Sequence, residues 1–291
     1  MNDKKDNILE VKKLVVDFPI FGGIMQRQID SVHAVKTVSF KLMRGETLGI
    51  VGESGSGKST LGNAILNVLQ LTAPDVEIDG EIYLNISNNE IDILSLQKKE
   101  MKKYRKHIQM IFQDPYSSLN PRMLVKDIIK ESLDINTDLN DNQKIEKVYW
   151  LLDKVGLSSE QSNRYPHEFS GGQRQRIGIA RALATEPEII IADEPVSALD
   201  VSIQAQIINL MMDLQEEFNL SIIFIAHDLS VVKHISNRVG VMNHGELVEL
   251  NETGLIFDNP NHDYTKELLR AIPKPDPIGR DDRKKNRLSL Q

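Results

Sequence analysis

The stretch "GESGSGKST", residues 52–60, constrains the fold more than any other part of this chain. It follows the apolar stretch "TLGIV" (47–51) and precedes a helical pattern that we expect to run from Ser59 to about Leu69. A glycine-rich loop between a buried strand and a helix lets backbone N–H groups turn toward phosphate oxygens at the positive end of the helix. A plain glycine turn is the alternative, but the Lys-Ser-Thr sequence favours a phosphate loop at the edge of an α/β sheet.

The loop contains three kinds of group that bind a nucleotide. Its glycines allow the backbone to turn inward, Lys58 reaches the β- and γ-phosphates, and the hydroxyl of Ser59 binds Mg²⁺. The residues assigned to the nucleotide are Gly52, Glu53, Ser54, Gly55, Ser56, Gly57, Lys58, Ser59 and Thr60.

An acidic pair follows a second apolar stretch, in "EIIIADEP" (188–195). The four apolar residues predict a buried strand, so Asp193 emerges at its C-terminal end, where open α/β sheets bind ligands. Asp193 is expected to hold Mg²⁺, and Glu194 to orient or deprotonate the attacking water. A solvated Asp-Glu-Pro turn is the alternative, and the phosphate loop favours the catalytic interpretation.

His227 follows "SIIFIA" (221–226), another buried strand that we expect to end at the same face. Its ring N–H can contact the γ-phosphate or the attacking water. A histidine at a strand end is more often structural, but the neighbouring motifs favour the phosphate contact here.

A second anion site is predicted in "HEFSGGQRQRIGIARAL" (167–183). Ser170 can cap a helix that starts near Gln173, and Gly171 and Gly172 leave backbone N–H groups free at its positive end. Such a helix start can hold a terminal phosphate, although it can also be a plain helix start with solvated basic residues. One nucleotide needs only one phosphate-binding loop. Therefore either the chain folds back so that both sites bind the same nucleotide, or this second site binds the nucleotide of another subunit.

The remaining pattern divides the chain into four parts. Residues 8–95 contain short strands and the phosphate loop, with a loop expected at 19–30, and residues 96–183 are mostly helical. Alternating strands and helices over 184–250 indicate a largely parallel sheet. Residues 251–291 form a C-terminal extension that ends in a charged tail, which we expect to be solvated.

Composition excludes several functions. A net charge of −7 argues against a nucleic-acid binder. The absence of cysteine excludes disulfides, thiolate metal sites and cysteine nucleophiles. The beginning of the chain lacks the apolar core of a signal peptide, and runs such as "IIFIA" (222–226) are too short to span a bilayer. We therefore expect a soluble chain that reaches a membrane only through a partner.

Six motifs in order over residues 8–273 resemble the ATP-binding subunits of ABC transporters. "GESGSGKS" is similar to the Walker A motif of that family and "IIIADE" to its Walker B motif. "FSGGQ" (169–173) is similar to the signature motif, with Phe169 where leucine is commonest. The resemblance implies a P-loop NTPase core of the α/β class, with an N-terminal antiparallel β subdomain and an inserted α-helical subdomain.

The resemblance also implies roles for individual residues. Gln113 in "IFQDP" matches the Q-loop, His227 the switch histidine and Asp200 in "SALD" the D-loop, while Phe18 lies where the family has an aromatic that stacks on adenine. The catalytic residues are then Glu194, His227, Gln113 and Lys58, and the metal ligands Ser59, Gln113 and Asp193. The signature residues that bind nucleotide are Ser170, Gly171, Gly172 and Gln173.

Longer segments resemble the oligopeptide, dipeptide and nickel importers, among them "IQMIFQDPYSSLNPRM" (108–123) and "NPNHDYTKELLRAIP" (259–273). The long loop after Phe18 is similar to that of the F-type subunit of oligopeptide systems. The resemblance implies ATP and Mg²⁺ as cofactors, and head-to-tail pairing in which the signature of one subunit closes over ATP bound by the other. The implied partners are a related D-type ATPase, two membrane permeases, contacted by residues 114–122, and an extracellular binding protein. The resemblance implies that nucleic acid is not a partner, and that the chain lies peripherally on the cytoplasmic face of the cell membrane.

Other functions remain as alternatives. An exporter or membrane-signalling ATPase usually has an acidic "TEVGE"-like stretch before the signature, where this chain has "RYPHEF" (164–169). A soluble ABC ATPase of DNA repair or translation typically needs a long coiled-coil insertion or two cassettes, and a small-molecule kinase leaves the signature unexplained. The cargo, whether peptide, nickel or a metal chelate, stays open because it never touches this subunit.

Overall fold

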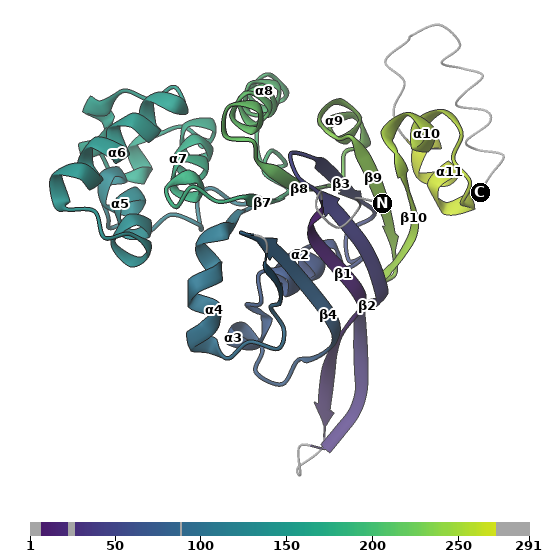
Figure 1. Ribbon diagram of the computed structural model, residues 1–291. Coiled ribbons are helices and arrows are strands. Elements are labelled where there is room, and N and C mark those ends of the chain that lie inside the picture. The colour runs from purple at the N-terminus through teal and green to yellow at the C-terminus, as the bar shows by residue number, and fades with distance from the viewer. Residues whose placement is uncertain (1–6, 23–26, 88, 272–291) are drawn as a thin grey trace, which may run out of the picture.

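The computed structural model describes residues 7–22, 27–87 and 89–271. Its strands form two sheets, a four-stranded antiparallel sheet in the order β2-β1-β4-β5 and a six-stranded sheet in the order β10-β9-β3-β8-β7-β6 (Figure 1). The charged end of the predicted tail, within residues 272–291, lies outside the described residues, as do residues 23–26 of the predicted loop.

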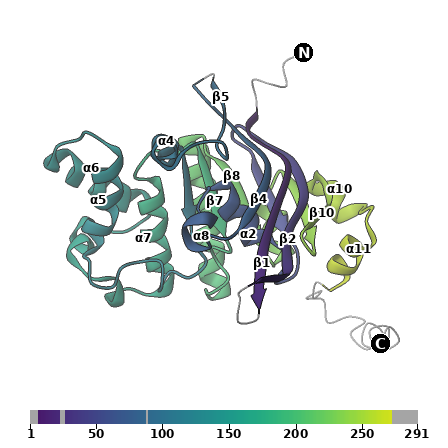
Figure 2. The same cartoon turned by 90° about the horizontal axis from the view of Figure 1, so that it is seen from below.

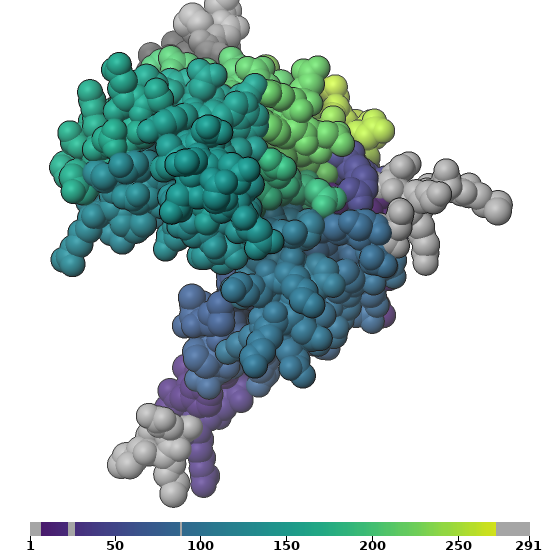
Figure 3. Space-filling model, turned by 60° about the vertical axis from the view of Figure 1, so that its left-hand side comes forward, coloured from purple at the N-terminus to yellow at the C-terminus, as the bar shows by residue number. Residues whose placement is uncertain are grey.

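The antiparallel sheet contains β1 (Asn7–Gly22), β2 (Arg27–Met43), β4 (Glu77–Ile86) and β5 (Asn89–Asp92). The prediction of a loop over 19–30 was wrong for most of its length, because β1 and β2 stay paired as far as Gly22 and Arg27. Apolar and β-branched residues such as Ile20, Phe21 and Ile29 favour continued strand pairing there. The resulting hairpin projects well beyond the body of the protein (Figures 1 and 3).

The six-stranded sheet is the core of the fold. Its strands are β3 (Thr47–Val51), β6 (Ile108–Ile111), β7 (Ile189–Asp193), β8 (Ser221–Ala226), β9 (Arg238–Asn243) and β10 (Glu246–Glu252). Strands β6, β7, β8, β3 and β9 run parallel and β10 is antiparallel to β9, which confirms the largely parallel sheet. The expectation of a mostly helical segment over 96–183 missed β6, because four residues that include Gln109 are too few to show a strand pattern.

Ten α-helices lie within the described ranges. They are α2 (Lys58–Ile65), α3 (Leu69–Thr72), α4 (Lys98–Tyr104), α5 (Val125–Asn136), α6 (Asp141–Lys154), α7 (Gly171–Leu183), α8 (Val201–Phe218), α9 (Leu229–Ile235), α10 (Thr253–Asp258) and α11 (Asp263–Arg270). The first predicted helix therefore ends at Ile65, four residues earlier than expected, and a separate short helix follows it. None of these helices is long and apolar enough to cross a bilayer.

Side chains that alternate along the core strands build two apolar layers. On β8, Ile223 and Ile225 contribute to the layer that contains α2 and the antiparallel sheet, whereas Ile222 and Phe224 face the layer that contains α8 and α9. The strands are therefore buried on both faces, as parallel sheets usually are. Helices α5, α6 and α7 form a lobe at one end of the molecule, and α10 and α11 lie at the opposite end (Figures 1 and 2).

Phe224→Ala should lower the free energy of unfolding by about 3–5 kcal/mol, because it removes a fully buried ring from the centre of the core sheet and leaves a cavity. The control is Phe21→Ala on the projecting hairpin, where the ring is 48% exposed and the change should stay within about 0.5 kcal/mol. Urea unfolding followed by circular dichroism measures both, and equal losses would contradict this placement of the two rings.

Candidate functional site

Four neighbouring parallel strands end at the same edge of the core sheet. Gly52 follows β3, His227 follows β8, Asp193 is the last residue of β7, and Gln113 lies two residues after β6. Because the carboxyl ends of parallel strands coincide, groups far apart in the chain surround one hollow of about 620 Å³. Its lining residues are Val32, His33, Ala34, Lys36, Ser54, Gly55, Gly57, Lys58, Ser59, Thr60, Gln113, Glu194, His227 and His244.

Lys58 begins α2 and is buried beneath the phosphate loop. Its Nζ donates to the carbonyl oxygens of Gly52 at 2.9 Å and Glu53 at 2.8 Å, so the loop itself satisfies the ammonium. Burial lowers the pKa of Lys58, and the nearby carboxylates of Glu194 and Asp193 oppose that shift.

Gly57 precedes α2 in the left-handed conformation, with φ at 98°. A Cβ at this position would lie 2.1 Å from the carbonyl oxygen of Ala34 on β2, closer than any side chain tolerates. The glycine thus allows β2 to approach the phosphate loop, which explains why β2 contributes to the pocket wall.

Ser59 lines the pocket and is hydrogen-bonded to Asp193, the last residue of β7. Ser59 Oγ donates to Asp193 Oδ1 at 2.9 Å. Asp193 is almost fully buried, and that burial raises its pKa despite the hydrogen bond from Ser59 and the charge of Lys58, which lower it. An adjacent hydroxyl and carboxylate are the oxygen ligands that Mg²⁺ takes alongside substrate phosphates. No cluster of three His, Cys, Asp or Glu residues within the described ranges would hold a metal by itself.

Glu194 accepts hydrogen bonds from two of the predicted residues at one carboxylate oxygen. Gln113 Nε2 donates to Oε2 at 3.1 Å, and His227 Nδ1 lies 2.9 Å from the same atom. Because an ionised carboxylate only accepts, the proton of the imidazole is assigned to Nδ1. The structure therefore brings Glu194, His227 and Gln113 together at the mouth of the pocket.

The backbone of Glu194 is in the left-handed region, with φ at 45°, which is unfavourable for a residue other than glycine. Its N–H donates to the carbonyl oxygen of Ile225 at 2.9 Å, and Ser197 Oγ donates to its carbonyl oxygen at 3.0 Å. These contacts hold a strained turn directly after β7, and the turn directs the carboxylate toward Gln113 and His227. Strained residues of this kind cluster at active sites.

The signature stretch lies outside this pocket. Ser170 Oγ accepts from the N–H of Gln173 at 3.3 Å, and Gln173 Oε1 accepts from the N–H of Ser170 at 3.0 Å, so the two residues form a capping box. The helix starts at Gly171, two residues before the predicted start. A Cβ on Gly172 would lie 2.5 Å from Ile203 Cγ2, so α7 packs closely on α8 at this point. The chain does not fold back to bring its two phosphate motifs into one pocket.

Two other predicted nucleotide contacts also lie outside the pocket lining. Phe18 on β1 is partly buried against the core between the sheets, while its cross-strand neighbour Val32 lines the pocket. Asp200 is exposed at the N-terminal end of α8 and makes no side-chain cap there. Neither side chain lines the pocket in this structure.

Sequence reasoning missed the pocket wall built by β2 and by the turn after β9. His33, Lys36 and His244 line the hollow, and His33 Nδ1 lies 2.8 Å from Asp17 Oδ1 on β1. No motif marks these residues, and His33 lies in an ordinary strand pattern. The glycines at 52 and 57 are the sequence signal for this approach, because a Cβ on Gly52 would lie 2.2 Å from the carbonyl oxygen of Met242 on β9 and one on Gly57 2.1 Å from that of Ala34 on β2.

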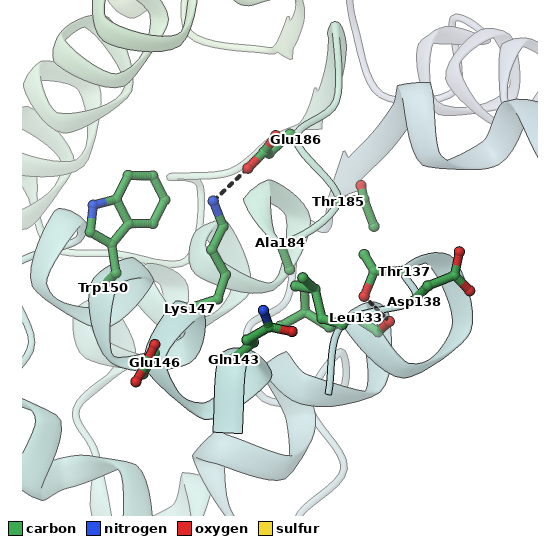
Figure 4. A pocket seen from close by; sticks show the side chains of 11 residues that line it. Leu133, Thr137, Asp138, Gln143, Glu146, Lys147, Trp150, Ala184, Thr185 and Glu186 are labelled. Atoms are coloured by element: carbon green, nitrogen blue, oxygen red, sulfur yellow. Dashed lines mark hydrogen bonds and ion pairs between the residues drawn. The ribbon is translucent and has the colours of Figure 1, made fainter. Parts of the chain in front are cut away.

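A larger hollow of about 740 Å³ lies between α5, α6 and the segment after α7 (Figure 4). Lys147 forms an ion pair with Glu186 there, and its Nζ lies 4.0 Å from the ring centre of Trp150. The hollow shares no lining residue with the phosphate pocket and contains no predicted catalytic residue. Its size therefore does not make it the reaction site.

Comparison with known proteins gives consistent matches. The family model described as "ABC transporter" matches residues 35–197. The chain is 53% identical to the oligopeptide transport ATP-binding protein AppF of Bacillus subtilis over 92% of this chain and 79% of that protein. It is 52% identical to OppF of Bacillus subtilis, also described as an oligopeptide transport ATP-binding protein, over 94% of this chain and 84% of that protein. Among solved structures, the dimeric post-hydrolysis state of the ATP-binding cassette MJ0796 bound to ADP and Pi has a TM-score of 0.70 at 28% identity, covering 84% of this chain and 98% of that one.

Asp193→Asn should stabilise the nucleotide-free protein at neutral pH, because it removes a carboxylate that burial disfavours in the charged form. A gain of about 1 kcal/mol would raise Tm by roughly 2 °C or slightly more. The raised pKa means that the carboxylate costs stability above its folded pKa, and that this cost disappears as pH falls toward about 4, the unfolded value. Calorimetry measures the difference in Tm between variant and parent, which should shrink as the pH falls from 7 toward about 4. A variant that is less stable than the parent at pH 7 would contradict the raised pKa of Asp193.

Proposed function

Because the chain belongs to the ABC transporter family, we propose that it is the ATP-hydrolysing subunit of an importer for oligopeptides. The observation that carries this proposal is one pocket lined by Lys58, Ser59 and Glu194, with Asp193 hydrogen-bonded to Ser59. Two relatives at just over 50% identity are named as oligopeptide transport ATP-binding proteins, which supports the cargo class. Dipeptides, nickel and metal chelates are the other cargoes to be tested.

We propose that the phosphates of ATP bind along the loop of residues 52–60. The backbone N–H groups at the start of α2 lie at its positive end, where an anion is stabilised. Lys58 would exchange its hydrogen bonds to the carbonyls of Gly52 and Glu53 for phosphate oxygens. Ser59 and Asp193, with Gln113, would hold Mg²⁺, which supplies positive charge to the transferring phosphoryl group.

Glu194 is proposed as the general base. Its carboxylate lies at the mouth of the pocket with one oxygen held by Gln113 and His227. In hydrolysis, water attacks the γ-phosphorus, the bond to the β-phosphate oxygen breaks, and Glu194 takes the proton of the water; the products are ADP and phosphate. His227 and Gln113 orient the carboxylate and the water, and both are exposed enough to respond to a bound γ-phosphate.

A head-to-tail dimer is proposed as the working state. Ser170, Gly171 and Gly172 at the start of α7 do not line the chain's own pocket, and the exposed Asp200 lies at the neighbouring start of α8. A phosphate held by a second subunit would meet this positive helix end. The similar cassette MJ0796 has been solved as a dimer. The second subunit is proposed to be a related D-type ATPase, and Phe18 and Gln173 to complete the nucleotide contacts.

The transport role requires membrane partners. We propose that the chain lies on the cytoplasmic face of the membrane, bound to two permease subunits and supplied by an extracellular binding protein. Residues 114–122 follow the Q-loop glutamine and are largely exposed, so they are the proposed permease contact. A contact there would couple the γ-phosphate state, sensed at Gln113, to the permease.

Glu194→Gln should keep ATP binding and lower kcat by about 10²-fold or more, because the amide cannot accept the proton of water. ATP binding is measured by calorimetry and hydrolysis by phosphate release from the assembled transporter. Glu246→Gln, an exposed carboxylate on β10, is the matched control and should hydrolyse normally. Normal turnover in Glu194→Gln would rule out its role as the base.

Ser170→Arg should inactivate the nucleotide site of the partner subunit. Lys58→Ala in this chain disables its own phosphate loop. In a dimer assembled with that variant, the remaining hydrolysis comes from ATP bound to the partner subunit. Adding Ser170→Arg should abolish that activity, since a large side chain would block the helix start. Ser159→Arg, at an exposed position in the same lobe, should leave it unchanged. Persistent hydrolysis with Ser170→Arg would exclude the head-to-tail arrangement.

A further inference from the structure

The C-terminal helix α11 contacts the phosphate loop directly. Tyr264, in the first turn of α11, accepts a hydrogen bond at its hydroxyl oxygen from the backbone N–H of Glu53, with an N–O distance of 3.2 Å. The two residues are 211 positions apart in the sequence. The C-terminal extension therefore contributes a hydrogen bond to the backbone that is proposed to bind phosphate.

The peptide group between Gly52 and Glu53 is held at both of its polar ends. Its carbonyl oxygen accepts from Lys58 Nζ at 2.9 Å, and its N–H donates to Tyr264. A cation on the carbonyl polarises the peptide and makes its N–H a better donor. The orientation of this one peptide thus depends on two side chains, one at the start of α2 and one from α11.

Tyr264 is itself fixed in place. Glu249 on β10 accepts from the backbone N–H groups of Asn261 at 2.9 Å and His262 at 3.0 Å, which ties the start of α11 to the edge of the core sheet. The N–H of Tyr264 donates to His262 Nδ1 at 3.2 Å, and the ring is partly buried against the core. A tyrosine hydroxyl is neutral at physiological pH, and burial raises the pKa of Tyr264 further.

We propose that Tyr264 is a positioning residue for ATP binding. If Lys58 moves to the phosphates, as the proposed function on which this inference rests requires, the Gly52–Glu53 peptide loses one of its two side-chain partners. Tyr264 is then the side chain that keeps the Gly52–Glu53 peptide in its orientation. The C-terminal extension in this way sets the affinity of the phosphate loop without touching the nucleotide.

Tyr264→Phe tests this, because it removes the hydroxyl and keeps the ring that packs α11. The Kd for ATP, measured by calorimetry on the full chain, should rise about threefold to tenfold, the effect expected from one neutral hydrogen bond. In the assembled transporter, KM for ATP should rise similarly while kcat changes less than twofold. Tyr149→Phe, on α6 in the lobe formed by α5, α6 and α7, is the matched control and should leave the Kd and the KM for ATP unchanged.

Hydrogen exchange followed by mass spectrometry separates positioning from simple packing. Exchange should accelerate in peptides covering residues 52–55 and stay unchanged in α11. An unchanged Kd, unchanged exchange in the loop, or faster exchange throughout α11 would each overturn the proposal. Failure of the parent chain to bind ATP would instead refute the proposed function, so the two failures are distinguishable.

Discussion

The pocket depends on the hydrogen-bonded register between neighbouring parallel strands. Val51 pairs with Ala226, and Asp193 pairs with Ile225, so the residues that follow β3, β8 and β7 emerge in one row. Since side chains alternate along a strand, a slip of one residue in β7 would turn Asp193 away from Ser59. The register of the strands therefore determines which side chains meet in the site.

At the same edge of the sheet, two charged side chains are buried, and burial makes their charged forms less favourable. Burial shifts the pKa of Lys58 down and that of Asp193 up, so both charged forms are less favourable here than in water. The loop carbonyls and the hydroxyl of Ser59 compensate for part of this cost. A pocket whose charges are already desolvated and oriented spends little further free energy on reorganisation when an anion arrives, which is how preorganised sites favour their transition states.

Much of this arrangement could be predicted from local sequence. Apolar runs that end in Gly52, Asp193 or His227 identify the strands and, through the rule for parallel sheets, the edge where they meet. The same reasoning missed β6, whose four residues carry too little periodicity, and the pairing of β1 and β2 beyond Phe18. It also missed Tyr264, because a contact across 211 residues depends on where β10 places α11 and leaves no mark on either segment.

The close packing of α7 on α8 has a consequence for how this sequence can vary. Gly172 leaves no room between its backbone and the branched side chain of Ile203. A methyl group at position 172 would need a smaller residue at 203, so substitutions at these two positions depend on each other. A chimaera that exchanged the signature stretch for one with a larger residue at position 172, while keeping Ile203, would carry a steric clash between α7 and α8.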